Sequence, residues 1–404
     1  MVEVTPTSEV DHPRTSLAAA PPTHVPWRRE PFRIFFPLGV LLAWLGISHW
    51  LLYAIGATTT YSCLFHGLVQ MQAFMMAFAI GFLLTALPRR TQTKPVSAGE
   101  IAAMATALIV VAGAAMAEWW MIVEAAYAAL FVLLLQFAIR RFLGREAGRR
   151  PPAAFVLIPF GVAHGVGGAV LIVVSTLRGV PAWTMGLGRL CVEQGVFLCF
   201  AIGVGGLVLP LMSGGAPPPD LDASPRERRK VVVYGAAGAG ILLSLILEQL
   251  GWARGGPLVR AMVVTSGLGV GAAAWRKPAR PGVHRKLVWL SVWLMPIGLA
   301  VSGLWPNYRV PALHILFIGG FSLMAFGVAT HVALSHLDME QDALGRPPAV
   351  VVLGVLFVIA LCARLAADMS ATYFVHLGWA AAAWLIGSAV WLGFLAPKFL
   401  RRVP

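Results

Sequence analysis

The feature of this sequence that most constrains its fold is a series of long apolar segments, each long enough to cross a lipid bilayer. A helix of about 20 residues spans roughly 30 Å of hydrocarbon, and twelve such segments follow one another along the 404 residues. We place them near 34–56, 62–87, 99–117, 119–139, 153–176, 188–212, 231–250, 257–275, 285–304, 311–335, 348–367 and 372–395. Only 12% of the residues are charged, against about a quarter in a soluble domain. The sequence therefore predicts an all-α, polytopic membrane bundle of about twelve transmembrane helices over 33–396.

The basic residues indicate the orientation of these helices, because cytoplasmic loops of membrane proteins are enriched in Lys and Arg. If both termini are cytoplasmic, the predicted inner segments hold 25 of the 31 Lys and Arg residues. The inner set includes a run that we interpret as a signal fixing orientation: Arg140, Arg141, Arg145, Arg149 and Arg150. The outer set has six members: Arg178, Arg189, Arg254, Arg260, Arg309 and Arg364. Because the basic residues follow the loops in this way, the net charge of +14 does not point to a nucleic-acid partner.

Both ends of the chain are predicted to be cytoplasmic tails. Residues 1–32 are rich in Pro, Thr and Ala and lack the apolar core of a signal peptide. We therefore expect a disordered N-terminal tail over 1–32 and a short C-terminal tail over 397–404.

Three of the apolar segments resemble one another. Segment 62–87 matches 311–335 at a shift of 248 residues, which superposes His66 on His314, and it matches 188–212 at a shift of 122 residues. These are the second, sixth and tenth of the twelve segments. We therefore interpret the chain as three related four-helix units.

Histidines gather at one predicted depth in the membrane. Four of the ten histidines lie near the predicted outer ends of their helices: His49, His66, His314 and His376. His164 lies near the middle of its helix, and Gln70 follows His66 by four residues, which places both on one helix face. Neutral imidazole is the usual protein ligand of haem iron and also suits copper. We therefore predict that His66 and His314 bind a metal, that Gln70 orients a ligand or water, and that the other three histidines are within reach.

Carboxylates also lie in the predicted outer half of the membrane, at Glu124, Glu193 and Glu248. An ionisable group is costly inside a bilayer, so each is expected to have a partner and is a candidate for function.

These segments resemble the NnrS family, bacterial twelve-helix membrane proteins that contain haem and copper and are linked to nitric oxide stress and denitrification. FHGLVQMQAFMMAFAIGFLLTALP, from residue 65, is similar to the family's second helix. GGLVLPLMSGG, from residue 205, is similar to the end of its sixth helix, and LHILFIGGFSLMAFGVATHVALSH, from residue 313, to its tenth. The resemblance implies a b-type haem, a role in nitric oxide tolerance or a denitrification-linked stress response, and the bacterial inner membrane. Besides the lipid bilayer, it implies nitric oxide or a membrane electron donor as partners.

The chain departs from the family at the residues that bear on copper. Leu68 and Val69 stand where the second helix of the family has the second histidine and the glutamate of a His-x-His-Glu group, and His331 stands where an arginine is expected. The arrangement is also similar to the main subunit of haem–copper oxidases, in which helices two and ten clamp the low-spin haem. Helices six and seven contain no histidine here, so oxygen reduction is not predicted.

The residues alone leave a second interpretation open, a secondary transporter with a polar site among its transmembrane helices. Twelve helices, internal repeats and scattered carboxylates are typical of transporters too. Transporter sites lie near the membrane midplane, whereas most of these histidines gather at one side. No reaction or substrate follows from the sequence.

Overall fold

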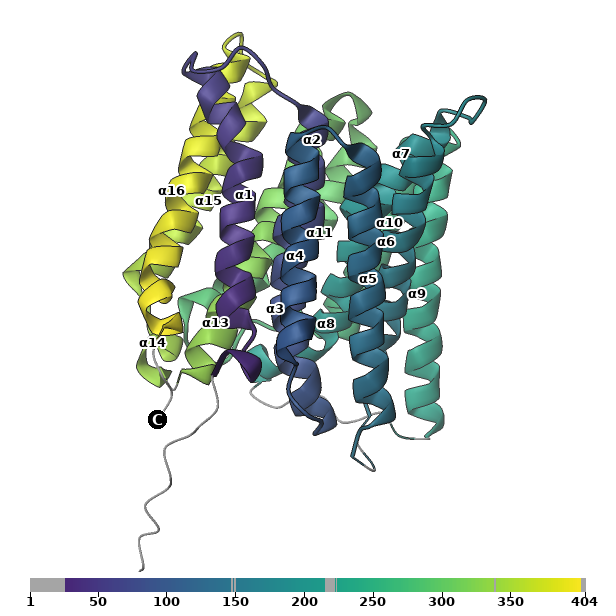
Figure 1. Ribbon diagram of the computed structural model, residues 1–404, viewed down its shortest axis with the longest axis vertical. Coiled ribbons are helices and arrows are strands. Elements are labelled where there is room, and N and C mark those ends of the chain that lie inside the picture. The colour runs from purple at the N-terminus through teal and green to yellow at the C-terminus, as the bar shows by residue number, and fades with distance from the viewer. Residues whose placement is uncertain are drawn as a thin grey trace, which may run out of the picture.

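The computed structural model describes residues 26–400 except 147, 149, 215–221, 223 and 338. These residues form helices and no strand, and Figure 1 shows the helices packed side by side as one bundle. Eleven helices of the described chain are long and apolar enough to cross a membrane. The predicted polytopic helical bundle is therefore confirmed, and the protein is a multi-pass membrane protein. Most of both predicted tails, residues 1–25 and 401–404, lies outside the described residues.

The helices follow the predicted segments closely. In chain order they are η1 (Pro26–Arg28), α1 (Phe32–Ala54), α2 (Cys63–Leu68), η2 (Val69–Met75), α3 (Met76–Thr91), α4 (Ala98–Met116), α5 (Trp120–Leu143), η3 (Ala153–Val156), α6 (Leu157–Val174), α7 (Trp183–Leu190), η4 (Cys191–Gly195), α8 (Val196–Gly214), α9 (Pro225–Gln249), α10 (Gly255–Val264), η5 (Thr265–Gly271), α11 (Val283–Leu304), η6 (Pro306–Tyr308), α12 (Arg309–His314), η7 (Ile315–Ser322), α13 (Leu323–His336), α14 (Glu340–Leu344), α15 (Pro348–Ala367) and α16 (Tyr373–Phe399). The segments η2, η4, η5 and η7 are π-helical, and each continues the helix before it. The predicted eighth span is α10 continued by η5, which is shorter than the other eleven.

The first and last long helices meet at one end of the bundle. Arg33 Nη1 at the start of α1 donates to the Phe399 carbonyl at the end of α16, at 2.9 Å. Figure 1 shows α1 beginning and α16 ending at the same end, as an even number of crossings requires. We call this the terminal end of the bundle and the opposite one the distal end.

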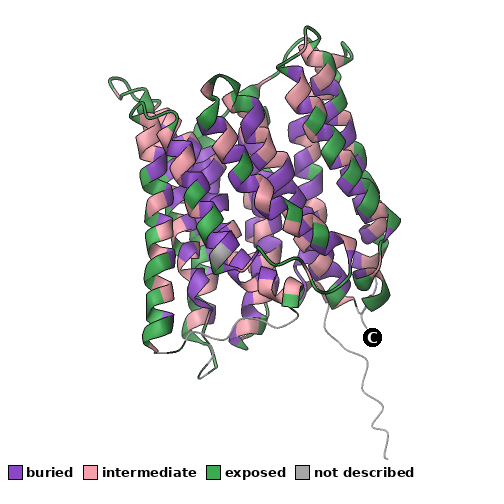
Figure 2. Ribbon diagram, turned by 180° about the vertical axis from the view of Figure 1, so that it is seen from behind, coloured by how far each residue is buried: buried purple, intermediate pink, exposed green. Residues whose placement is uncertain are grey.

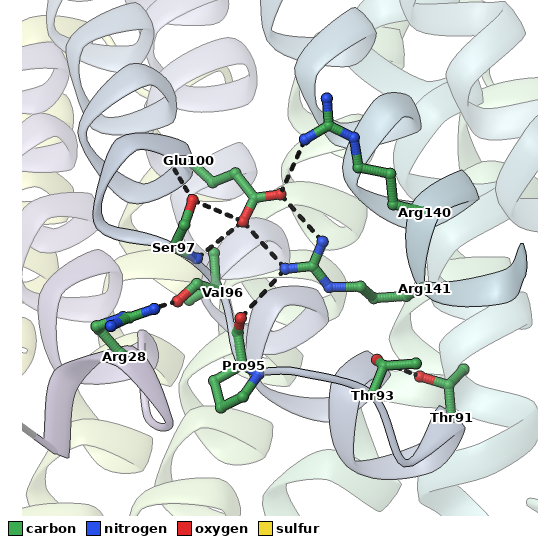
Figure 3. A network of polar contacts seen from close by, with 9 residues as sticks. All are labelled: Arg28, Thr91, Thr93, Pro95, Val96, Ser97, Glu100, Arg140 and Arg141. Carbon is green, nitrogen blue, oxygen red and sulfur yellow. Dashed lines mark hydrogen bonds and ion pairs between the residues drawn. The ribbon is translucent and has the colours of Figure 1, made fainter. Parts of the chain in front are cut away.

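The start of α4 illustrates how the sequence sets a helix boundary and a contact between helices together. The Ser97 hydroxyl accepts from the Glu100 N–H, and Glu100 Oε2 accepts from the Ser97 N–H at 2.8 Å, which is a capping box. Figure 3 shows the same carboxylate facing the guanidinium of Arg141 from α5, with N–O distances of 3.0 and 3.1 Å. Arg141 therefore joins two helices, in addition to belonging to the run that we interpret as fixing orientation.

Three helices form the centre of the bundle, and they are the three that resemble one another in sequence. Buried residues make up 83% of the apolar window of Cys63–Thr91, 72% of that of Trp183–Gly214 and 61% of that of Pro306–His336. In the other eight spans of the described chain, the buried share lies between 28% and 50%. Figure 2 shows buried residues in the middle of the bundle and exposed ones on its outward faces. The repeat therefore corresponds to a spatial arrangement in which one helix of each unit lies at the centre.

Equivalent residues of the central helices face a common space between them. Each central helix supplies four residues with the spacing i, i+3, i+4 and i+7, which is one helix face. We call them the axial residues: Met75, Phe78, Ala79 and Phe82; Phe197, Phe200, Ala201 and Val204; Phe321, Met324, Ala325 and Val328. The first two sets differ by the shift of 122 residues that the sequence indicates, but the third differs from the first by 246 rather than 248. His66 and His314 match at 248 residues, so the two levels of these helices follow different shifts.

Candidate functional site

A cavity of about 390 Å³ lies among the central helices, and it is lined by residues near the distal ends of their helices, such as Trp50, Cys63 and Tyr373. Its volume is in the range of small-molecule sites, about 300–1,000 Å³. Most of its wall is apolar and aromatic, including Phe74, Phe317 and Trp384, and a few polar side chains face it from four different helices. We call it the histidine cavity, because His66 and His314 both line it.

His66 and Gln70 are held by the neighbouring helix α1. The His66 Nδ1–H donates to the Gly46 carbonyl at 2.8 Å, and Gln70 Nε2 donates to the Ala43 carbonyl at 2.9 Å. Close approach of the two helices depends on Gly46, since a Cβ atom there would lie 2.5 Å from Gln70 Nε2. The imidazole and the amide predicted to lie on one face therefore do so, and both line the cavity.

His314 is held by its own helix. Its Nδ1–H donates to the Val310 carbonyl, one turn earlier, at 2.8 Å. A carbonyl oxygen only accepts hydrogen bonds, so both cavity histidines carry their proton on Nδ1. In a neutral ring this leaves the Nε2 lone pair free to bind a metal, and a histidine ligand usually donates its other N–H to a carbonyl or carboxylate in this way.

Three arginines line the same cavity: Arg189 of α7, Arg309 of α12 and Arg364 of α15. They are half of the six basic residues that the sequence assigns to the outer side. Arg364 is the most buried of them, with 6% of its side chain exposed. The cavity thus combines two nitrogen ligands with three guanidinium groups.

Each cavity arginine has a carboxylate partner. Arg189 Nη2 lies 2.7 Å from Glu193 Oε1, Arg309 Nη2 lies 2.7 Å from Glu248 Oε1, and Arg364 bonds Asp368. Glu248 also bonds the fully buried Arg260, which does not line the cavity. Two of the three carboxylates expected to have partners are therefore paired with arginines at this cavity.

The sequence alone did not single out the arginines as site residues, because their position in loops and at helix ends was interpreted as topology. One signal could have found them. Basic residues are rare on the predicted outer side. Arg189 and Arg309 lie at the beginning of two central helices, and Arg364 lies in the predicted eleventh segment. Their scarcity there is a reason to ask what each of them binds.

The other predicted ligands lie outside the cavity wall. His49 lies next to His66, with 6.0 Å between ring centroids. His376 packs edge-on against Trp379 at 5.0 Å. His164 donates from Nδ1 to the Phe160 carbonyl at 2.7 Å and is buried between α6 and η4. The structure thus brings together His66, His314 and Gln70, places His49 next to them, and leaves His164 and His376 apart.

Glu124 forms a separate buried site on the far side of the second helix. Its two carboxylate oxygens accept from Gln72 Nε2 at 3.0 and 2.9 Å, and only 1% of Glu124 is exposed. Gln72 follows Gln70 by two residues and therefore lies on a different face of the helix. Glu124, one of the three carboxylates predicted in the outer half, is thus bonded to an amide and does not line the histidine cavity.

The donor set suits haem better than a bare metal ion. Among the residues that the structure describes, no group of three or more His, Cys, Asp or Glu side chains could hold a metal ion. Haem needs only axial ligands from the protein, because its own ring supplies four nitrogens, and its two carboxylates match the arginines of the cavity. The two histidines that share the cavity therefore suit haem, whereas the described residues hold no group of three or more His, Cys, Asp or Glu side chains for the copper site that the family resemblance implies.

Comparison with known proteins adds one finding. Residues 26–402 match a family model described as NnrS protein, which covers nearly the whole chain. No curated protein matches the chain.

Proposed function

Since the chain belongs to the NnrS family of nitric-oxide-response membrane proteins, we propose that it binds haem b in the histidine cavity and acts in nitric oxide tolerance. The observation that carries the proposal is the presence of two histidines in one cavity, each with Nδ1–H bonded to a carbonyl at 2.8 Å. This arrangement is typical of histidines that bind a metal through Nε2.

The residues have separate roles in holding the haem. His66 and His314 would hold the iron through their Nε2 nitrogens, and the bonds to Gly46 and Val310 keep each ring in the required tautomer. The three cavity arginines, each already bonded to a carboxylate of the protein, would place positive charge near the haem carboxylates. The aromatic wall excludes water and so influences the reduction potential of the iron.

When bound, haem would supply an iron that exchanges single electrons and that would take up nitric oxide at the coordination position of one histidine, which that histidine would vacate. The partners of this site are therefore nitric oxide and a membrane electron donor, in addition to the surrounding lipid. Which of sensing, scavenging or electron transfer the protein performs depends on that donor, and the cavity is compatible with each.

We propose the inner membrane of a bacterium as the location, with both termini in the cytoplasm. The support is the uneven distribution of the 31 Lys and Arg residues over the predicted loops. In this orientation the histidine cavity lies toward the periplasmic side.

The visible absorption spectrum of the purified protein tests the haem proposal most directly. Protein isolated from cells supplied with haem should show a sharp Soret band and the bands of a low-spin iron. Apoprotein mixed with haem should develop the same spectrum to a stoichiometry of one. If neither preparation takes up haem, the proposal fails, and the secondary transporter becomes the better account of the chain.

A further inference from the structure

A second cavity, of about 100 Å³, lies next to the histidine cavity on its terminal side. The twelve axial residues line it, together with Phe36, Leu83 and Ala329. All of these side chains are apolar. We call it the axial cavity, because each of the three central helices contributes the same four positions to its wall.

Small side chains at matching positions keep this space open. The third axial position is alanine in every central helix: Ala79, Ala201 and Ala325. Packing in protein interiors is dense enough that few voids exceed the size of a water molecule. The same small residue in all three units therefore identifies the space as a property of the repeat rather than a local packing fault.

The axial cavity has no group that would hold water. An ordered buried water needs two to four polar partners, whereas an apolar cavity of about 150 Å³ stays dry and binds xenon or benzene. With about 100 Å³, the axial cavity is also smaller than the sites of most organic ligands, which begin near 300 Å³. Its apolar wall therefore favours a small, uncharged occupant that needs no hydrogen bond.

One side chain lines both cavities. Met75 lines both of them, and a methionine side chain has three rotatable bonds, so it changes shape easily. The π segments end at this level, since η2 ends at Met75 and η7 ends at Ser322, which lines the histidine cavity beside Phe321 of the axial cavity. Interruptions of this kind are frequent at functional sites.

We propose that the axial cavity holds a small uncharged diatomic gas of the nitric oxide class and supplies it to the histidine cavity past Met75. The supply step rests on the proposed haem function, whereas gas binding does not. Such a molecule loses no hydrogen bonds on leaving water or lipid, so it enters the axial cavity without the penalty that excludes polar ligands.

Xenon is the probe for gas binding, and it requires no haem. Crystals of the full-length protein pressurised with xenon should show an anomalous peak within the axial cavity. Ala201→Leu or Ala325→Leu should fill the space and remove the peak, and two variants guard against one that fails to fold. Ala239→Leu is the matched control, because Ala239 is exposed on the outward face of α9. Absence of xenon from the wild-type cavity, or xenon retained in both filled variants, would overturn the proposal.

The supply step is tested by the rate at which the reduced, haem-loaded protein binds nitric oxide. Stopped-flow mixing should give a several-fold slower association for Ala201→Leu than for Ala239→Leu, with identical spectra before mixing. Equal rates in the two variants would exclude supply through this cavity. If the protein binds xenon but never binds haem, the proposed function fails while the gas site stands.

Discussion

His66 and His314 each donate a hydrogen bond from Nδ1–H to a backbone carbonyl, but the two carbonyls belong to different parts of the fold. His66 donates to Gly46 on the adjacent helix α1, whereas His314 donates to Val310 within its own helix, and both distances are 2.8 Å. The position of the His66 ring therefore depends on how α1 packs against the second helix, where a Cβ atom at position 46 would lie 2.5 Å from Gln70 Nε2. The His314 ring is fixed by local geometry.

Removal of either cavity histidine should change the haem spectrum. His66→Ala or His314→Ala takes away one axial ligand, so the six-coordinate low-spin spectrum should be lost or become five-coordinate, while helix insertion persists because it depends on the apolar residues. His376→Ala is the matched control, since His376 packs against Trp379 outside the cavity. An unchanged low-spin spectrum in the double alanine variant would show that other residues bind the iron.

Replacing neighbouring arginines of α5 should have unequal effects on stability. Arg141 is buried and makes two bonds to Glu100, whereas 59% of the Arg140 side chain is exposed and its closest approach to the same carboxylate is 4.0 Å. Arg141→Gln should lower the free energy of unfolding by about 1.5–3 kcal/mol. Arg140→Gln should lower it by less than about 1 kcal/mol. Thermal unfolding in one detergent measures both, and equal losses would show that the bonds in Figure 3 do not stabilise the fold.

A carboxylate at the terminal end should make stability depend on pH. Burial raises the pKa of Glu30, but bonds from His336 and Arg33 outweigh this effect and hold the pKa below its usual value. Arg89 also approaches Glu30, at 3.5 Å. A depressed pKa means that the ionised form stabilises the fold above the ordinary carboxyl pKa, and that this stabilisation is lost as the pH falls through the lowered pKa.

Glu30→Gln tests this dependence. The wild type should unfold at a higher temperature than the variant at pH 7, and the two melting temperatures should converge as the pH falls below about 4, where carboxyl groups take up protons. A constant difference over the whole pH range would mean that the Glu30 charge has no part in stability.

The bundle was predictable from the sequence because the bilayer imposes a length on every crossing helix. The repeat also predicted that the second and tenth helices contribute histidines to one site, since His66 and His314 match at a shift of 248 residues. The π segments were not predictable, because η2 and η7 have ordinary apolar sequences. The axial residues of the third central helix match those of the first at 246 residues instead of 248, and the single shift read from the sequence did not indicate this.

The candidate site was predictable only in part. Histidine is rare and polar enough to attract notice in an apolar helix, and the two that share a cavity were both identified. The partners of the arginines depend on which helices meet at the cavity, and loop sequences carry no such information. Arg309 and Glu248, for example, come from α12 and α9, and their 2.7 Å contact follows from the packing of the third unit on the second.

The orientation of the chain can be measured with reporter fusions. Both termini and the segments after residues 144, 218 and 280 belong to the predicted inner loops, which are rich in Lys and Arg. Fusions at these three points should all report the cytoplasm. A periplasmic signal at any of them would contradict the twelve-helix topology and would also reverse or displace the side on which the histidine cavity lies.

Arg364 should determine how tightly the haem is held and at what potential it is reduced. Its side chain is 6% exposed, lines the histidine cavity and carries a positive charge. Arg364→Gln removes a charge-assisted bond to a haem carboxylate, worth about 1.5–3 kcal/mol, so haem binding should weaken about tenfold or more. Loss of a positive charge near the iron also disfavours the reduced state, which lowers the midpoint potential. Arg364→Lys keeps the charge but not the paired bonds. The midpoint potential of this variant should therefore stay close to that of the wild type, whereas its affinity for haem should fall. Arg178→Gln is the matched control, because Arg178 is exposed in the loop after α6. Haem titration measures the affinity, and spectroelectrochemistry measures the midpoint potential. If Arg364→Gln and Arg178→Gln agree in both quantities, Arg364 is not part of the haem site.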